Sequence, residues 1–207
     1  KSDLFYSYMQ RFGIGHLTGI DLASEVTGRL KLPGDSDWYP VDLATNAFGQ
    51  GVSVTPMQMV MAASALANEG QMVYPHVLLA TLQDGRQHAM APQVVGNPIS
   101  ASTASTISEM LAIALETEAS RGVVPGYRVA GKTGTAQVPT AYGYYDPELT
   151  NASFIGWGPV DDPRFLVYVW LEKPRSSEWG SVVAAHVFRQ VVEKLVVLMG
   201  IPPDAVR

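Results

Sequence analysis

The segment that most restricts the fold is GYRVAGKTGTAQVP, residues 126–139. A proline precedes it, another ends it, and it contains glycines, threonines and valines. Glycine is a poor helix former, β-branched residues prefer strands, and proline ends a helix. The segment therefore predicts an extended strand with Lys132 near its middle.

An alternative interpretation of the same segment is a phosphate-binding loop. Residues 126–133 fit the pattern G-x-x-x-x-G-K-[ST], whose backbone holds phosphates when a strand precedes it and a helix follows it. Here Val124 and Pro125 resemble a turn, while Gly134 and Pro139 oppose a helix. The nucleotide-binding alternative is disfavoured, and it depends on a helix following the lysine.

As a strand, the segment carries a compact cluster of groups suited to an anion. Lys132 supplies a cation, and Thr133 and Thr135 supply hydroxyls that together can grip a carboxylate. Gly131 and Gly134 leave an edge where a substrate backbone can lie close. A backbone N–H on such a strand can stabilise an oxyanion during acyl transfer. The plain alternative is a surface strand with an exposed lysine.

Composition limits the remaining classes of function. The chain has 207 residues, 47% of them hydrophobic, which is enough for one domain with a substantial core. The net charge is −5, so no basic surplus indicates nucleic acid, and no run of about 18 apolar residues indicates a membrane span. The absence of cysteine excludes disulfides and thiolate metal sites. We expect no cofactor and no metal.

Periodicity and turn signals predict the order of elements. Helices are expected at 4–12, 55–70, 100–121 and 182–199, a hairpin at 74–90, strands at 127–138, 152–160 and 165–173, and a long irregular connection at 15–50. Helices followed by adjacent strands favour an α+β fold with an antiparallel sheet over alternating strand–helix units.

Two of these helices are expected to bury one apolar stripe each. In the helix at 100–121 the stripe is Ile107, Met110, Leu111, Ala114 and Leu115. In the final helix the stripe is Val183, Val187, Val191, Leu195 and Leu198.

Five segments, taken in order, resemble one protein family. They are RFGIGHLTGIDL, NAFGQGVSVTPMQMVMAASALANEG, GKTGTAQVP, ASFIGWGPVDDPRFLVYVWLEKP and WGSVVAAHVF. This order resembles the C-terminal part of the transpeptidase domain of class B penicillin-binding proteins, whose third active-site motif is K-T-G. His186 departs from the family, which commonly has proline there. The resemblance implies that residues 1–207 are the C-terminal portion of one transpeptidase domain.

The resemblance implies a fold and a reaction. The fold is that of serine β-lactamases and D,D-peptidases, an antiparallel sheet of about five strands flanked by helices, present here only in part. The reaction is peptidoglycan cross-linking, in which a serine takes the acyl group from the D-Ala-D-Ala end of one stem peptide and passes it to an amine of another. β-Lactam antibiotics mimic that dipeptide and acylate the serine. The implied location is the outer face of the bacterial cytoplasmic membrane, with cell-wall synthesis partners and an anchor outside this chain.

The resemblance also assigns roles within the K-T-G segment. Lys132 is expected near the active-site serine, where it contributes to the electrostatics and the proton network. Thr133 and Thr135 are expected to bind the carboxylate of the substrate or drug, and Gly134 leaves the strand open to it. The backbone N–H of Thr135 is expected to form half of the oxyanion hole, so Lys132 and Thr135 are the catalytic candidates. The loop at 140–150 is expected either to border the cleft or to be solvated.

The two other motifs of the family are absent from these 207 residues. No serine lies three positions before a lysine, so S-x-x-K with its nucleophile is missing, and no serine lies two positions before an asparagine, so S-x-N is missing. Both are expected in an upstream part of the same domain, and this chain alone is expected to be inactive. A β-lactam sensor module on the same fold and a non-catalytic assembly partner stay open as alternatives.

Overall fold

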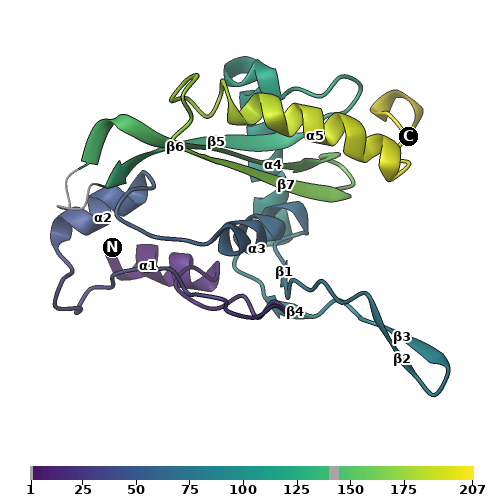
Figure 1. Ribbon diagram of the computed structural model, residues 1–207, viewed down its shortest axis with the longest axis horizontal. Helices are drawn as coiled ribbons and strands as arrows, with labels where there is room; N and C mark the ends of the chain where they lie inside the picture. Colours follow the sequence, from purple (N-terminus) through teal and green to yellow (C-terminus); the bar gives the residue numbers. More distant parts are fainter. Residues whose placement is uncertain (1, 140–144) are drawn as a thin grey trace. The chain divides into compact units, whose positions relative to one another are not determined.

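The computed structural model describes residues 2–139 and 145–207. The chain divides into two compact units, Lys1–Ala101 and Ser102–Arg207. Figure 1 labels the elements of both units. The loop expected at 140–150 lies outside the described residues up to position 144, and from Tyr145 onward the chain is a strand.

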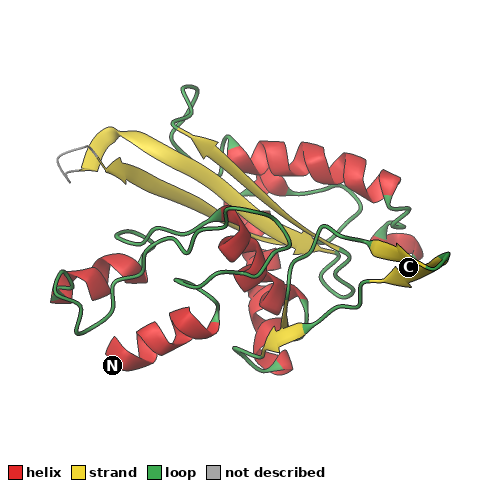
Figure 2. Cartoon of the chain, turned by 60° about the horizontal axis from the view of Figure 1, so that its bottom comes forward, coloured by secondary structure: helices red, strands yellow, loops and turns green. Residues whose placement is uncertain are grey.

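The second unit is built on a three-stranded antiparallel sheet in the order β5-β6-β7 (Figures 1 and 2). The strands are β5 (Ala130–Pro139), β6 (Tyr145–Gly158) and β7 (Phe165–Glu172). The sequence predicts all three, but β6 begins earlier than the expected residue 152. The residues at 145–151 include Asp, Pro and Glu, which have low strand propensity, and pairing with the end of β5 holds them in the sheet.

One face of this sheet is buried beneath α5 (Ala184–Leu198), which lies along it in Figure 1. The rings of Phe154 on β6 and Phe188 on α5 are 4.6 Å apart, and both side chains are fully buried. A Cβ on Gly131 or Gly156 would collide with one of these rings, so both positions require glycine for packing. Each buried phenylalanine contributes on the order of 2–3 kcal/mol through the apolar surface removed from water.

The buried stripe of α5 differs from the predicted one. The buried residues are Ala184, Ala185, Phe188, Val192 and Val196. Val191 and Leu198 of the predicted stripe are exposed. Because α5 has apolar residues on several sides, helical spacing alone cannot choose between stripes, and contact with Phe154 decides which one is buried.

The preceding helix, α4 (Ala101–Glu118), confirms the helix expected at 100–121 but also buries a different stripe. Its buried residues are Ala104, Ser108, Ala112 and Leu115. Only Leu115 belongs to the predicted set, and Met110 from that set is exposed. The buried face carries mostly alanine and serine, whose short side chains give a weak hydrophobic signal. A 3-10 turn, η1 (Ser120–Gly122), follows α4, and a second, η2 (Asp204–Val206), follows α5.

The first unit contains α3 (Pro56–Ala67), which begins where the sequence predicts. The Thr55 hydroxyl accepts the Gln58 N–H at 3.1 Å, and Gln58 Oε1 accepts the Thr55 N–H at 2.9 Å, which forms a capping box. Gln58 is fully buried, and its Nε2 also donates to the carbonyl oxygens of His16 at 2.6 Å and Thr27 at 2.8 Å. The T-P-x-Q sequence therefore ties two distant loops to the start of α3.

We expect Gln58→Ala to lower the free energy of unfolding by about 2–4 kcal/mol, because it removes three hydrogen bonds of a buried side chain. Gln190→Ala, at an exposed position of α5, is the control and should change it by less than about 0.5 kcal/mol. Chemical denaturation followed by circular dichroism measures both. Equal effects of the two substitutions would contradict the role given to Gln58.

The other helices of the first unit are α1 (Ser2–Arg11) and α2 (Pro40–Ala47). α1 confirms the helix expected at 4–12, whereas α2 lies inside the segment predicted to be irregular, so that prediction is wrong there. Proline occupies the first position of α2, and the Asp42 carboxylate accepts the Tyr39 N–H at 2.7 Å. Proline followed by an acidic residue in the first turn is a helix-start signal that the sequence contains.

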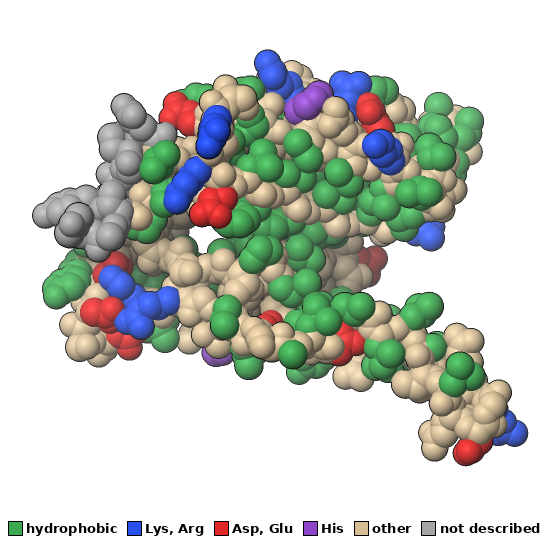
Figure 3. All heavy atoms as spheres, viewed as in Figure 1, with side chains coloured by type: hydrophobic (Ala, Val, Ile, Leu, Met, Phe, Trp, Pro, Cys, Tyr) green, Lys and Arg blue, Asp and Glu red, His purple; other side chains and the backbone are tan. Residues whose placement is uncertain are grey.

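The hairpin predicted at 74–90 is present as β2 (Ala80–Gln83) and β3 (Arg86–Ala89). Asp84 and Gly85 both have positive φ, as a tight two-residue turn requires. Figure 3 shows apolar side chains on this hairpin, where Leu79 and Leu82 are exposed. Two further strands, β1 (Met72–Val73) and β4 (Val94–Gly96), pair with each other and are too short for a periodic signal.

Asp21 holds the base of the hairpin. Its carboxylate accepts the N–H groups of Val77 at 2.7 Å and Leu78 at 2.8 Å. These bonds stabilise the charged form and hold the pKa of Asp21 below its ordinary value of 3.8. Because the pKa of Asp21 is lower in the folded state than in the unfolded state, its carboxylate stabilises the fold fully at pH values above the unfolded-state pKa. This stabilisation is lost as the pH falls through the folded-state pKa.

The amides of Val77 and Leu78 should therefore be protected from hydrogen exchange near neutral pH and lose protection as the pH falls through the lowered pKa of Asp21. Asp21→Asn should have low protection throughout this range, because the amide side chain carries no charge. Protection factors measured by NMR test this. Equal protection of the two proteins at about pH 6 would show that the carboxylate is not responsible.

Candidate active site

The K-T-G residues lie on β5, at an edge of the three-stranded sheet. Within the described residues, β5 pairs with β6 only. Alternate residues of such a strand direct their N–H and C=O groups away from the one partner, so β5 offers backbone groups to an incoming peptide. The chain continues as a strand through Pro139, and the helix that a phosphate loop needs after Thr133 is replaced by this strand. The nucleotide-binding alternative is therefore wrong.

Lys132 is exposed on the face of the sheet opposite α5. Lys132 is in register with Ile155 of β6, so the two side chains share a face of the sheet. The preceding residue of β6, Phe154, faces α5, and adjacent strand residues point to opposite faces. Its ammonium group donates to the Thr133 carbonyl oxygen at 3.0 Å and lies 3.4 Å from the Thr133 hydroxyl. In the part of the chain that the structure describes, no salt bridge involves Lys132, so its charge is available to an anion.

Thr135 is held by the loop that precedes α5. The Gly180 N–H donates to Thr135 Oγ1 at 3.1 Å, and the Thr150 hydroxyl donates to the Glu178 carbonyl oxygen at 3.1 Å. A hydroxyl that accepts an N–H keeps its single proton for donation, so Thr135 presents a donor at the strand edge. A side chain at position 180 is excluded, because a Cβ there would meet carbonyl oxygens of β5 and β6.

Trp179 is a candidate that sequence reasoning missed. It precedes Gly180, and 56% of its surface is exposed although the loop packs against β5. An exposed indole one residue from Gly180 offers a planar apolar surface to a ligand. In the sequence, Trp179 is marked only as the first residue of the segment WGSVVAAHVF, because the contact that brings this loop to β5 joins Gly180 and Thr135 across 45 residues of chain.

Gly134 is half-buried and in register with Ser153 of β6. Their side-chain positions share the face that carries Lys132. Lys132 and Gly134 thus lie on one face of β5 and the two threonines on the other, and the Lys132 ammonium group comes within 3.4 Å of the Thr133 hydroxyl at the exposed strand edge. Such a set can bind a carboxylate and pair with an extended peptide.

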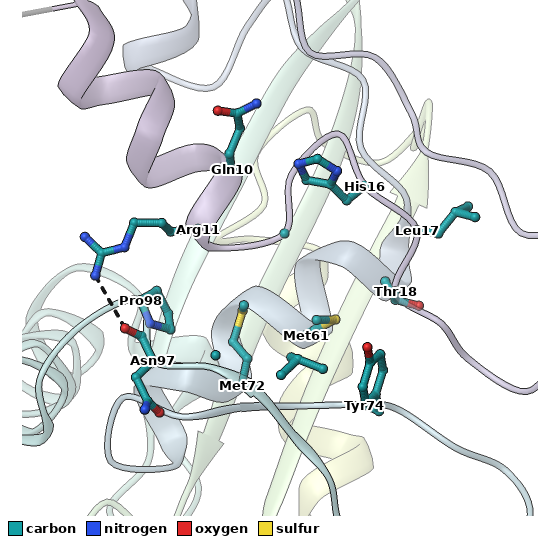
Figure 4. A pocket seen from close by; sticks show the side chains of 13 residues that line it. Gln10, Arg11, His16, Leu17, Thr18, Met61, Met72, Tyr74, Asn97 and Pro98 are labelled. Carbon is teal, nitrogen blue, oxygen red and sulfur yellow. Dashed lines mark hydrogen bonds between the residues drawn. The ribbon is translucent and has the colours of Figure 1, made fainter.

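A pocket of about 390 Å³ lies elsewhere, within the first unit (Figure 4). The buried side chains of Met61 and Met72 line it together with polar residues of α1 and of the loop after α1. Arg11 on α1 donates to the Asn97 carbonyl oxygen at 3.4 Å. None of the K-T-G residues lines this pocket, and its charged group is already engaged, so the candidate site is the edge of β5.

None of the helices within residues 2–139 and 145–207 combines the length and hydropathy of a membrane-spanning segment. The same residues contain no cluster of three or more histidine, aspartate or glutamate side chains arranged to hold a metal ion.

This chain is similar to proteins of known sequence along almost its whole length. The model of the penicillin binding protein transpeptidase domain matches residues 1–193. Stage V sporulation protein D of Bacillus subtilis is 37% identical over 98% of this chain and 32% of its own length. Penicillin-binding protein PbpB of Mycobacterium tuberculosis is 32% identical over 97% of this chain and 31% of its own length. The chain thus spans about a third of the length of these curated relatives.

Solved structures agree with the fold. Penicillin-binding protein 3 of Mycobacterium tuberculosis, complexed with ampicillin, superposes with a TM-score of 0.87 at 30% identity, covering 97% of this chain and 47% of that one. The transpeptidase domain of penicillin-binding protein 3 from Burkholderia pseudomallei gives 0.81 at 27% identity, covering 99% and 60%. These matches confirm the α+β fold and the family that the five segments predict. The chain belongs to the family of class B penicillin-binding protein transpeptidase domains.

Proposed function

We propose that this chain is the K-T-G-bearing, C-terminal part of a peptidoglycan D,D-transpeptidase that β-lactams acylate. The observation that carries the proposal is the edge of β5, where the Lys132 cation and the oriented Thr135 hydroxyl lie on one exposed strand. The D-Ala-D-Ala end of a stem peptide is an extended segment that finishes in a carboxylate. It can pair with the strand edge while its carboxylate meets these two side chains.

Each residue of the segment has a role in this proposal. Lys132 supplies positive potential to the site, and the hydroxyls of Thr133 and Thr135 donate to the carboxylate. The Thr135 N–H donates to the oxyanion that develops on the attacked carbonyl, where charge appears only in the transition state. Gly134 contributes backbone alone, and Trp179 flanks the carboxylate site with an apolar surface.

The covalent steps need the upstream part of the domain. The serine of S-x-x-K attacks the carbonyl of the penultimate D-Ala, its proton passes to a base, and the terminal D-Ala leaves with a proton. An amine of a second stem peptide then attacks the ester, releases the serine and forms the cross-link. With a β-lactam, the ring amide opens instead and the leaving group stays attached, so the acyl-enzyme persists.

Relatives support this function and its setting. Peptidoglycan D,D-transpeptidase MrdA of Acinetobacter baumannii is 31% identical over 90% of this chain, and the related Mycobacterium structures include ampicillin and aztreonam complexes. The proposed location is the outer face of the cytoplasmic membrane, where peptidoglycan is assembled. The proposed partners are the upstream part of the same domain and other proteins of cell-wall synthesis.

A fluorescent penicillin tests the proposal. We expect covalent labelling of the full-length protein and none of residues 1–207 alone, because these residues lack the S-x-x-K serine and its lysine, and any other serine without a base is a weak nucleophile. A peptide ending in D-Ala-D-Ala should slow the labelling, and the same peptide ending in L-Ala-L-Ala is the control. A stable adduct on the 207-residue chain, or no labelling of the full-length protein, would contradict the proposal.

A further inference from the structure

The glycine of K-T-G has one specific neighbour. Gly134 and Ser153 are direct register partners on β5 and β6. A Cβ at position 134 would overlap the Ser153 hydroxyl oxygen, while the Ser153 Cβ would stay at an ordinary contact distance of 3.8 Å. Apart from the adjoining residues of β5, no other described atom lies within 4 Å of that position. One hydroxyl therefore occupies the space that a side chain at 134 would need.

That hydroxyl is itself held in place. Ser153 is half-buried, and its hydroxyl is hydrogen-bonded to the hydroxyl of Tyr168 on β7. Burial raises the pKa of Tyr168 above its ordinary value, while the hydrogen bond with Ser153 acts in the opposite direction. Turning the Ser153 hydroxyl away from Gly134 would break this bond and leave a partly buried phenol without its partner.

We propose that Ser153 and Tyr168 are positioning residues of the K-T-G strand. Their hydroxyl pair fills the space beside Gly134, sets the spacing of β5 and β6 there, and so fixes Lys132 and Thr135 on either side. On this view position 134 must be glycine because of a hydroxyl on the neighbouring strand, whereas the sequence predicts glycine there to leave the strand open to substrate. The inference rests on the proposed function only for its activity readout.

Removing the Ser153 hydroxyl should restore the activity that Gly134→Ala loses. In the full-length protein, Gly134→Ala should lower the second-order rate constant of acylation by a fluorescent penicillin by about 100-fold, since a displacement of about 1 Å at such a site has that effect. Ser153→Ala should lower it only about 3- to 10-fold. Gly134→Ala/Ser153→Ala should recover to within about threefold of Ser153→Ala, because two methyl groups fit where a methyl and a hydroxyl do not.

Melting temperatures separate positioning from simple folding. Ser153→Ala and Tyr168→Phe should reduce the acylation rate while leaving the melting temperature within about 2 °C of the parent, and Ser176→Ala, at an exposed position, should change neither. The melting temperature of Gly134→Ala should fall and should recover in the double variant. This recovery needs no acylation, so it tests the steric claim even if the parent protein proves unreactive to penicillin.

Two results would overturn the inference while leaving the proposed function intact. The first is a reactive parent protein whose double variant is as slow and as destabilised as Gly134→Ala. The second is a loss of activity in Ser153→Ala and Tyr168→Phe that follows the loss of melting temperature in proportion. An unreactive parent with a rescued melting temperature would contradict only the proposed function.

Discussion

Lys132→Ala in the full-length protein is expected to lower the rate of β-lactam acylation by about 10²- to 10³-fold, the range seen when a group that stabilises developing charge is removed. The ammonium group sits on an exposed strand edge beside the Thr133 hydroxyl, with no carboxylate neutralising it in the described residues. Alanine removes both the attraction for the substrate carboxylate and the positive potential at the reacting serine. Stopped-flow acylation kinetics with a fluorescent penicillin measure the effect.

Lys173→Ala is the matched control for this substitution. Lys173 is also exposed, but its ammonium group lies 3.7 Å from the Glu172 carboxylate at the end of β7. Its removal should change the acylation rate by less than about threefold, because exposed ion pairs contribute little. Lys132→Arg should restore only part of the activity, since a guanidinium group is planar and larger than an ammonium group. Equal rates for the two alanine variants would rule out the role given to Lys132.

Gly180→Ala is expected to lower the acylation rate by about 10- to 100-fold and to reduce thermal stability. A Cβ at this position would meet the carbonyl oxygens of Gly134 and Ser153, so the loop must move away from β5. The Gly180 N–H then no longer holds the Thr135 hydroxyl. Gly96→Ala is the control, because nothing lies within 4 Å of a Cβ there and its φ is not positive.

A double-variant cycle shows whether Gly180 acts through Thr135. Thr135→Val keeps the shape of the side chain and removes the hydroxyl. If the N–H of Gly180 works by orienting that hydroxyl, Gly180→Ala should lower the rate much less in the Thr135→Val background than in the parent. Fully additive losses in acylation rate would show that the loop affects the site by another route.

Local signals in the sequence predict several elements correctly. The threonine and proline that open α3 mark its first turn, and the aspartate and glycine of the hairpin mark its turn. The glycines and β-branched residues around Lys132 predict β5, and the same composition argues against the helix of a phosphate loop. These features depend on backbone preferences of neighbouring residues, so they can be deduced without knowing what packs against them.

The faces of helices could not be predicted in the same way. Both stripes of α5 are apolar, and only the ring of Phe154 selects the one that includes Phe188. In α4 the buried face consists mainly of alanine and serine, which a search for large apolar residues passes over. Hydrophobic spacing says that a helix is amphipathic, but the choice among comparable faces is made by the partner surface.

The sequence alone determined the family, the strand that bears Lys132 and the chemical groups presented along that strand, because these follow from local propensity and from the order of motifs. Only the tertiary structure decided that Gly180 orients Thr135, that the neighbouring Trp179 is exposed and that the Ser153 hydroxyl fills the space next to Gly134. The contact between Gly134 and Ser153 joins residues 19 positions apart, and that between Thr135 and Gly180 joins residues 45 positions apart. Sheet register and loop packing determine which distant residues meet, and neither can be deduced from neighbouring residues.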